Sequence, residues 1–330
     1  MRPGDPEQYD AATLVQRIRD LLQIPDLPVD LLGSAPWVAQ GLLADRYRFG
    51  RVFLVGDSAH RHPPATGLGL NSGIQDVHNL AWKLAMVLQG FAGDGLLDTY
   101  ETERRPIARR NVRWALLGFS NAQLTAPALG LVPGDPKTSR ENLLALLADD
   151  DEGEARRARM VHVLDVNRIE FQANDLDIGL VYEQGALVPD GTARPPRDPF
   201  GFRNTKTTRP GHRLSHAWIV RDGAMVSTLD LVELLAFTLL VGGKADGWKE
   251  AAGAVATTLG VRIQVFAIGD AGSVIDRDHA WRRVRGHDDG GAVLVRPDHH
   301  VAWRAATRPN SPAADLEQAL RQILGRTQTP

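Results

Sequence analysis

The stretch from residue 52 to residue 76 holds the residue types that chemistry on a bound ligand needs. Asp57 directly follows an apolar run, and its carboxylate can accept hydrogen bonds from sugar-like hydroxyl groups. Gly67 and Gly69 have no side chains, so the backbone there can approach a flat ligand closely. A helix that begins near Asn71 directs free N–H groups and its positive dipole end at the same place. The pattern indicates a site for an aromatic ring system that accumulates negative charge.

Other interpretations of this stretch stay open. A lone Asp57 is commonly a helix or turn cap. Ser58, His60 and His62 suggest a hydrolase or a metal site. However, no G-x-S-x-G elbow surrounds the serine, and a metal needs ligands from elsewhere in the chain. We therefore interpret His62 as structural and expect no metal site.

The composition limits the classes of function. Of 330 residues, 43% are hydrophobic and 24% are charged, which predicts a sizeable packed core and about two domains. The net charge of −2 gives no electrostatic reason to bind nucleic acid or an anionic membrane. The absence of cysteine excludes disulfides and dithiol redox chemistry. The first residues lack the apolar core of a signal peptide, and the longest apolar stretch, 229–241, contains two acids. We expect a cytoplasmic protein.

The spacing of apolar residues predicts the elements that position this stretch. We expect helices over 8–23, from 71 and over 96–124, with strands over 29–32 and 51–56. The second strand is an uninterrupted apolar run, which is typical of a parallel strand buried on both faces.

The helix from 71 has Asn71 or Ser72 as its N-cap and Gly90 as its stop. Its expected apolar stripe is Ile74, Val77, Ala81, Leu84 and Leu88. Pro106 kinks or divides the next helix.

Charged residues cluster in two places. Arg104-Arg105 and Arg109-Arg110 lie on the helix over 96–124, and the nearby Glu101 and Glu103 suggest ordinary ion pairing. The acidic and arginine-rich run over 149–159 is typical of a solvated face. A domain junction is expected between this run and residue 180.

The last 150 residues alternate in a compact α/β order. Asp298 and its neighbours form the expected hairpin turn, and scattered histidines such as His212, His216, His299 and His300 are interpreted as surface or hydrogen-bonded core residues. The expected strands are 217–220, 238–241, 262–268, 292–295 and 300–303, and the expected helices are 229–237, 247–259 and 313–324.

The segment RVFLVGDSAHRHPPATGLGLNSGIQDVHNLAWKLA, together with YETERRP at residues 100–106, closely resembles the second FAD-binding motif of para-hydroxybenzoate hydroxylase-like flavoprotein monooxygenases. The resemblance implies that Asp57 hydrogen-bonds the ribityl chain and that Pro64 lies beside the isoalloxazine. It also implies that the N–H groups of Leu70 and Asn71 approach flavin N1 and O2. The implied cofactor-binding residues are Gly56, Asp57, Pro64, Gly67, Gly69, Leu70 and Asn71.

Three later segments, RPGHRLSHAW, STLDL and GAVLVRPDHHVAWR, resemble the thioredoxin-like tail of the phenol hydroxylase and chlorophenol monooxygenase branch. The resemblance implies an α/β protein with a partial FAD-binding and substrate domain over 1–130. A charged helical linker over 131–180 and a thioredoxin-like domain over 181–330 follow. The implied activity is hydroxylation of a phenolic ring with FAD, NAD(P)H and O2.

The G-x-G-x-x-G turn that holds the FAD pyrophosphate in this family has no match in the sequence. We therefore expect the chain to correspond to the C-terminal three-fifths of such an enzyme, and no catalytic residue can be named. Two alternatives stay open: a non-catalytic assembly module, and half of a split enzyme. The expected assembly also stays open between a homodimer and a complex with a partner chain that supplies the ADP-binding half.

Overall fold

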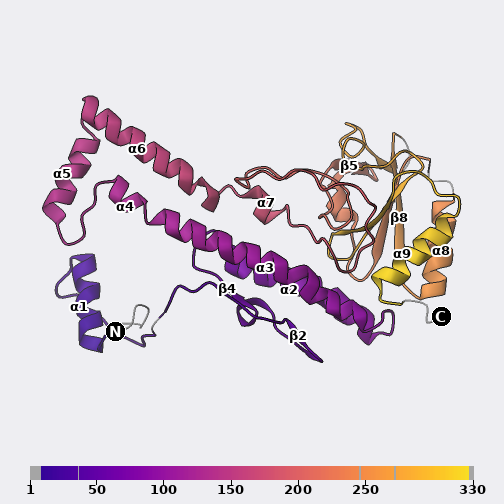
Figure 1. The fold of residues 1–330 in the computed structure, drawn as a ribbon, viewed down its shortest axis with the longest axis horizontal. Helices are drawn as coiled ribbons and strands as arrows, with labels where there is room; N and C mark the ends of the chain where they lie inside the picture. The colour runs from indigo at the N-terminus through magenta and orange to yellow at the C-terminus, as the bar shows by residue number, and fades with distance from the viewer. Residues whose placement is uncertain (1–8, 36, 245–246, 271–272, 327–330) are drawn as a thin grey trace. The chain divides into compact units, whose positions relative to one another are not determined.

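The computed structural model describes residues 9–35, 37–244, 247–270 and 273–326. The chain forms two compact units, residues 1–40 and 41–330 (Figure 1). Within the described residues, none of the helices combines the length and apolar character needed to cross a membrane.

The first unit contains helix α1 (Ala11–Leu22), which confirms the predicted helix. Asp10 caps it, because its carboxylate accepts a hydrogen bond of 2.7 Å from the N–H of Thr13. The predicted strand over 29–32 is wrong. The backbone there is irregular and Leu32 is 94% exposed, so neither a neighbouring strand nor a core stabilises an extended segment.

The second unit begins with two small antiparallel pairs. β1 (Leu42–Leu43) pairs with β4 (His60–Arg61), and β2 (Arg48–Phe49) pairs with β3 (Val52–Phe53). The expected parallel strand, buried on both faces, is therefore wrong. The apolar run belongs to a short hairpin in which Val52 is 61% exposed.

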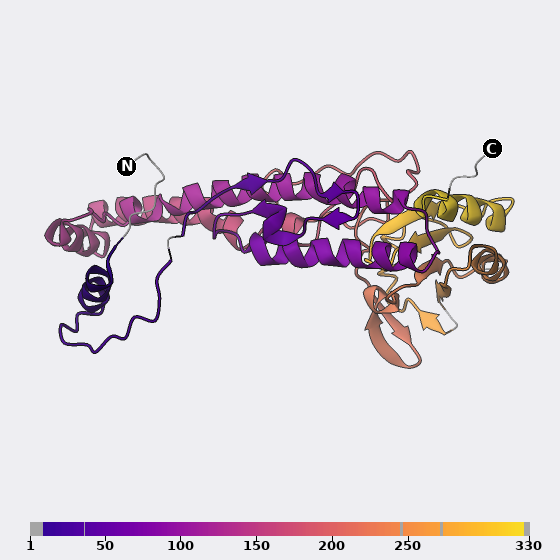
Figure 2. The same ribbon diagram turned by 90° about the horizontal axis from the view of Figure 1, so that it is seen from below.

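Two long helices follow, α2 (Leu68–Leu88) and α3 (Gly95–Ala122), and they lie side by side (Figures 1 and 2). Helix α3 runs through Pro106 as one helix and is not divided. Gly90, with φ +77°, ends α2 as predicted.

The predicted apolar stripe of α2 is not its buried face. Ile74 is 57% exposed, Val77 is 53% exposed and Leu88 is 82% exposed. The buried face instead carries polar side chains at helical spacing: Ser72, Asp76, Asn79 and Lys83. The helix therefore packs against α3 through polar contacts.

A helical region leads to the C-terminal domain. It contains α4 (Thr125–Ala128), α5 (Pro136–Leu146), α6 (Asp151–Asn167) and α7 (Asn174–Asp177), with a 3₁₀ turn at Arg168–Glu170. The charged run on α6 is mostly exposed, as predicted.

Within the described residues, seven strands form the C-terminal sheet in the order β11-β10-β7-β8-β9-β5-β6. The strands are β5 (Trp218–Arg221), β6 (Ala224–Ser227), β7 (Phe237–Val241), β8 (Ile263–Gly269), β9 (Val274–Ile275), β10 (Ala292–Val295) and β11 (Val301–Ala305). The five predicted strands are confirmed, whereas β6 and β9 were not predicted. β8 pairs in parallel with both β7 and β9, and the other neighbouring strands pair antiparallel.

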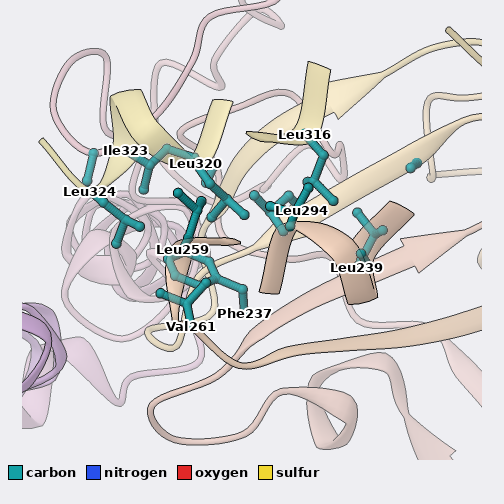
Figure 3. Packing of buried hydrophobic residues seen from close by; sticks show 14 of the residues in the cluster. Phe237, Leu239, Leu259, Val261, Leu294, Leu316, Leu320, Ile323 and Leu324 are labelled. Carbon is teal, nitrogen blue, oxygen red and sulfur yellow. The ribbon is translucent and has the colours of Figure 1, made fainter. Parts of the chain in front are cut away.

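Helices α8 (Trp248–Leu259) and α9 (Pro312–Ile323) confirm two further predictions. Figure 3 shows the core that α9 shares with the strands, where Leu316 and Leu320 lie near Leu294. The predicted helix over 229–237 is wrong. A capping box between Ser227 and Asp230 starts a single 3₁₀ turn, Thr228–Leu231, and the chain then enters β7.

The segment YETERRP lies on α3 and fixes the loops around it. The hydroxyl of Tyr100 donates to the carbonyl oxygen of Leu54 at 2.8 Å. Glu101 accepts from the N–H of Tyr47 at 2.7 Å. The guanidinium of Arg105 donates to the carbonyl oxygen of Ala44 at 3.0 Å. These side chains hold both strand pairs against α3.

Glu103 connects α3 with the C-terminal domain. Its two carboxylate oxygens accept a bidentate pair of hydrogen bonds from Arg296, at 2.7 and 2.9 Å. They also accept from Lys83 at 2.7 Å, from Asn79 at 2.6 Å and from the N–H of Ala186 at 2.8 Å. The charged side chains are fully buried. The expected ordinary ion pairing on this helix is therefore wrong for Glu103, whose partners come from α2, from the segment between α7 and β5, and from the turn between β10 and β11.

Charge balance sets the pKa values in this cluster. Burial alone raises the pKa of Glu103, but the charges of Arg296 and Lys83 outweigh burial and hold that pKa at about 2. Burial lowers the pKa of Lys83 to about 8, although the Glu103 carboxylate acts in the opposite direction.

Glu103→Gln should lower the free energy of unfolding by about 3 kcal/mol at pH 7, because the buried Lys83 loses its carboxylate partner and the buried Arg296 keeps only Asp298. Because the pKa of Glu103 is lowered in the folded protein, the stabilisation by its carboxylate is fully present above the ordinary glutamate pKa of 4.5. This stabilisation is lost as the pH falls to about 2. The difference between the two proteins should therefore narrow over that range in urea titrations.

Arg262→Gln is the matched control. It removes an exposed ion pair with Glu233, whose side chains are 71% and 51% exposed. The free energy of unfolding of this control variant should fall by less than about 1 kcal/mol. Equal losses for both variants would contradict the assignment of Glu103.

Candidate functional site

The residues expected to bind a ligand lie between β3 and the first turn of α2; residues 56–71 are called the glycine loop here. Gly56 has φ +58° and Gly67 has φ +63°, in the left-handed region that favours glycine. Gly56 opens a 3₁₀ turn (Gly56–Ser58), and Gly67 is the N-cap of α2. The chain can therefore reverse direction twice within a short distance.

The structure leaves most of the candidate binding residues of this loop open to solvent. Asp57, Pro64, Gly67, Leu70 and Asn71 are exposed, and Gly56 and Gly69 are partly exposed. A Cβ atom built on Gly69 meets nothing within 4 Å. The space beside Gly69 is thus empty of protein atoms from the described residues, and a flat ligand can lie against its backbone.

Helix α2 begins three residues earlier than expected. Its N-cap is Gly67, not Asn71 or Ser72, and no side chain caps it. Helices α1, α5 and α6 differ, because an aspartate side chain caps each of them. The side chain of Asn71 donates instead to the carbonyl oxygen of Gly67 at 2.8 Å. The uncapped end of α2 is a site of positive electrostatic potential.

This early start changes which N–H groups are free. In an α-helix the N–H groups of the N-cap and the first three residues have no intrahelical acceptor. Counting from Gly67, these are the N–H groups up to Leu70, whereas that of Asn71 is the first to meet an intrahelical carbonyl oxygen. Leu70 therefore has the more available N–H of the two residues that the resemblance singled out.

The buried carboxylate of Asp76 fixes the glycine loop through hydrogen bonds. Its carboxylate accepts from the N–H of Gly56 at 3.2 Å, from Nε2 of His60 at 2.7 Å and from Nε of Arg104 at 2.8 Å. Burial raises the pKa of Asp76, but the hydrogen bond from His60 and the charge of Arg104 outweigh burial and hold it below its usual value. The carboxylate is therefore ionised, and it fixes the turn that presents Asp57.

Arg104 also anchors α2. Its guanidinium donates to the backbone oxygen of Ser72 at 3.3 Å and to the side chain of Gln75 at 3.2 Å. A third bond of 3.3 Å reaches the hydroxyl of Tyr182. Asp76 and Arg104 were missed from the sequence alone. The signal that could have found them is the row of polar residues at positions 72, 76, 79 and 83.

The two histidines of the loop lie together. The rings of His60 and His62 meet edge to face, with centroids 4.9 Å apart. Burial and the neighbouring His60 lower the pKa of His62 to about 4. Within the described ranges no group of three or more histidine, aspartate or glutamate side chains is placed to hold a metal ion. The structural role of His62 stays a prediction.

Comparison with known families defines the class of this architecture. Residues 2–115 match the FAD binding domain, and residues 207–327 match the C-terminal domain of aromatic-ring hydroxylases. The glycine loop, Asp76 and Arg104 all lie in the first match, and Arg296 lies in the second. The expected α/β fold, an FAD-binding part followed by a C-terminal sheet domain, is confirmed.

Individual relatives are similar over nearly the whole chain. Phenol 2-monooxygenase from Pseudomonas sp. (strain EST1001) is 39% identical over 97% of this chain and 52% of the relative. The 2,4-dichlorophenol 6-monooxygenase of Delftia acidovorans is 36% identical over 97% of this chain and 55% of the relative. The chain spans about half the length of the curated relatives it matches.

Solved structures agree. The flavin-dependent monooxygenase PieE, in complex with FAD and substrate, has a TM-score of 0.87 and 37% identity, over 99% of this chain and 56% of that chain. Aklavinone-11 hydroxylase, in a ternary complex with FAD and aklavinone, has a TM-score of 0.73 and 31% identity, over 98% of this chain and 52% of that chain.

Two glycines of α2 should respond differently to substitution. A Cβ on Gly73 lies 3.3 Å from the Cα of Gly56, so Gly73→Val should push the glycine loop away and cost about 1–3 kcal/mol. Gly69→Val enters open space and should change the free energy of unfolding by less than about 0.5 kcal/mol. Urea unfolding followed by circular dichroism measures both. Unfolding of the Gly69 variant would make that glycine structural.

Proposed function

We propose that the glycine loop binds the flavin half of FAD, and that the protein takes part in hydroxylation of an aromatic substrate. The observation that carries the proposal is the uncapped start of α2, with open backbone at Gly69 and an exposed Asp57 in the same loop. The match of this segment to an FAD binding domain supports it. FAD, when bound and reduced by NAD(P)H, would supply the chemistry that activates O2.

The residues of the loop would divide the binding between them. The Asp57 carboxylate would accept hydrogen bonds from the ribityl hydroxyls, and Pro64 would lie along the ring system. The free N–H groups at the start of α2, with that of Leu70 foremost, would stabilise the negative charge that reduced flavin carries near N1 and O2. Gly56, Gly67 and Gly69 would let the backbone come close.

Asp76 and Arg104 would keep this arrangement rigid. Asp76 accepts a hydrogen bond from the turn at Gly56, and Arg104 donates to the backbone of α2 at Ser72. Because Asp76 and Arg104 also pair with each other, the turn at Gly56 cannot move away from α2 without breaking buried charged contacts. Rigid placement matters, because electrostatic stabilisation works only when the donors are already oriented.

The exposed apolar face of α2 supports the proposal that another polypeptide segment covers it. Ile74, Val77 and Ala81 line a groove of about 570 Å³ together with Leu234 and Leu235. Apolar side chains gathered in one exposed groove are typical of a surface that another polypeptide covers. A second copy of this chain, in a homodimer, or a chain that supplies the ADP-binding half would cover this groove.

The location of the protein in the cytoplasm stays a prediction.

The alternative function is a non-catalytic assembly module with a vestigial flavin site. Its support is the same apolar groove, which offers a contact surface without any need for FAD. The colour of the purified protein separates the two: a retained yellow flavin supports the first proposal, and a colourless protein that does not bind added FAD supports the second.

Asp57→Ala should raise the dissociation constant for FAD about 10- to 100-fold, because a hydrogen bond to a charged group contributes about 1.5–3 kcal/mol. Quenching of flavin fluorescence measures it, with Asp26→Ala in the other compact unit as the matched control. An unchanged constant would remove Asp57 from the site.

Gly69→Val should abolish FAD binding while the circular dichroism spectrum of the protein stays unchanged, because the valine side chain fills the space where the ring system would lie.

Residues 1–330 alone should bind FAD with a micromolar dissociation constant at best. Without a G-x-G-x-x-G turn the pyrophosphate lacks a second helix N-terminus, and association costs about 4 kcal/mol or more. Calorimetry with FAD and an assay of phenol-stimulated NADPH oxidation measure this. Nanomolar binding with turnover by this chain would overturn the expectation.

A further inference from the structure

A cavity of about 210 Å³ lies between α2 and the C-terminal domain, and none of its lining residues belongs to the glycine loop. Its walls include side chains from α2, from α7 and the segment after it, and from the C-terminal domain: Gln75, Asp177, Leu180, Arg213, Asp298 and His300. Since a cavity of about 150 Å³ in a protein core accommodates benzene, a small organic molecule fits this volume.

The walls of the cavity carry two opposite charges that do not pair with each other. The guanidinium of Arg213 has no hydrogen bond or ion pair within the part of the chain that the structure describes, and burial lowers its pKa. The carboxylate of Asp177 also has no partner among the described residues, and burial raises its pKa. Burial disfavours both charged forms, so each of them gains from a ligand group of the opposite charge.

The other ionisable groups discussed here add no further net charge at pH 7. Burial raises the pKa of Asp298, but the charge of Arg296 outweighs burial and holds that pKa well below its usual value. Burial also lowers the pKa of His300 below its usual value and that of His299 to about 4, so both rings are neutral at pH 7. One unpaired cation and one unpaired carboxylate remain, which favours a ligand that carries one charge of each sign.

His300 offers an unsatisfied acceptor to the same ligand. The residue is only 5% exposed, and its Nδ1 lies 2.9 Å from the carbonyl oxygen of Asp298. A carbonyl oxygen can only accept, so Nδ1 carries the proton and Nε2 is the acceptor. Nε2 is buried and has no partner among the described residues. A buried acceptor without a donor is costly, so this atom favours a ligand with an N–H or O–H group.

Gln75 offers a neutral donor. Its side-chain oxygen accepts from the guanidinium of Arg104 at 3.2 Å, which leaves the NH2 of the amide as the group that can donate to a ligand. The cavity therefore presents one charged and one neutral donor, Arg213 and Gln75, together with one charged and one neutral acceptor, Asp177 and His300.

We propose that this cavity binds a small zwitterion of the α-amino acid class. Its carboxylate accepts from Arg213 and Gln75, and its ammonium group donates to Asp177 and to Nε2 of His300. A simple anion leaves the acceptors unsatisfied, and a simple cation leaves the donors unsatisfied. The aliphatic side chain of Leu180 provides an apolar wall for a short side chain of the ligand. The site is separate from the glycine loop, and its occupation does not require FAD.

Calorimetric titration of the full chain with L-alanine at pH 7, without FAD, tests the proposal. Propionate and ethylamine are the matched probes, because propionate lacks the ammonium group of L-alanine and ethylamine lacks its carboxylate. We expect one molecule of L-alanine per chain and at least about tenfold weaker binding of either probe, since each loses charge-assisted hydrogen bonds. Propionate that binds as tightly as L-alanine would show a simple anion site and overturn the proposal, and so would a folded chain that does not bind L-alanine.

Two variants separate the contributions of the opposite charges. Arg213→Gln should weaken the binding of L-alanine and propionate about tenfold and leave that of ethylamine unchanged. Asp177→Asn should weaken the binding of L-alanine and ethylamine about tenfold and should not weaken that of propionate. Asp177 is exposed, so this variant should fold, and Asp222→Asn, an exposed change in the turn between β5 and β6, is its matched control. A dissociation constant for L-alanine that is unchanged in Asp177→Asn would contradict the site, even where Arg213→Gln fails to fold.

Asp57→Ala separates this inference from the function proposed for the glycine loop. It should leave L-alanine binding unchanged, and Arg213→Gln should leave FAD binding unchanged. Competition between FAD and L-alanine would place both in one site and overturn the proposal. L-alanine binding by a chain that does not bind FAD would support this site and contradict only the function proposed for the glycine loop.

Discussion

The bidentate contact between Glu103 and Arg296 is the constraint on which the rest of the second unit depends. It joins a helix of the FAD-binding part to the hairpin of the C-terminal sheet, and it is fully buried. Glu103 stands next to Arg104 on α3, so the helix that fixes the C-terminal domain also fixes α2 and, through Asp76, the glycine loop. A rotation of α3 would disturb all of these contacts together.

Buried charges of this kind give specificity more than stability. Desolvation of a carboxylate and its cations costs several kcal/mol, and an apolar contact of the same shape is often as stable. Here the carboxylate of Glu103 has five donors around it, so an alternative packing of α2 on α3 leaves charges unpaired. This is a physical reason for the two polar helix faces, and it explains how a loop whose candidate binding residues are mostly exposed can hold a defined conformation.

The sequence predicts the fold best where burial follows simple apolar patterns. Five strands and two helices of the C-terminal domain were predicted because β7 is apolar except for Thr238, β10 is entirely apolar and α9 is amphipathic. The sequence pattern fails to predict the structure where buried residues are polar or where apolar residues are exposed. Ile74 and Val77 look like a core stripe but are exposed, whereas Asp76 and Lys83 look like surface residues but are buried. The start of α2 was misplaced because a glycine N-cap leaves no side-chain signal and Asn71 mimics a cap. The partners of Glu103 lie 20 and 193 residues away, beyond the reach of local patterns.

The same buried network extends to the cavity beside α2. Asn79 donates to both Glu103 and Asp298, and Arg296 donates to both of these carboxylates. The backbone oxygen of Asp298 in turn accepts a hydrogen bond from Nδ1–H of His300, which leaves Nε2 as the ring's acceptor, without a partner among the described residues. The backbone of Asp298 therefore sets the tautomer of His300, and Arg296 holds the side chain of the same aspartate. The walls of this cavity and the interface between the two parts of the unit therefore depend on one group of side chains.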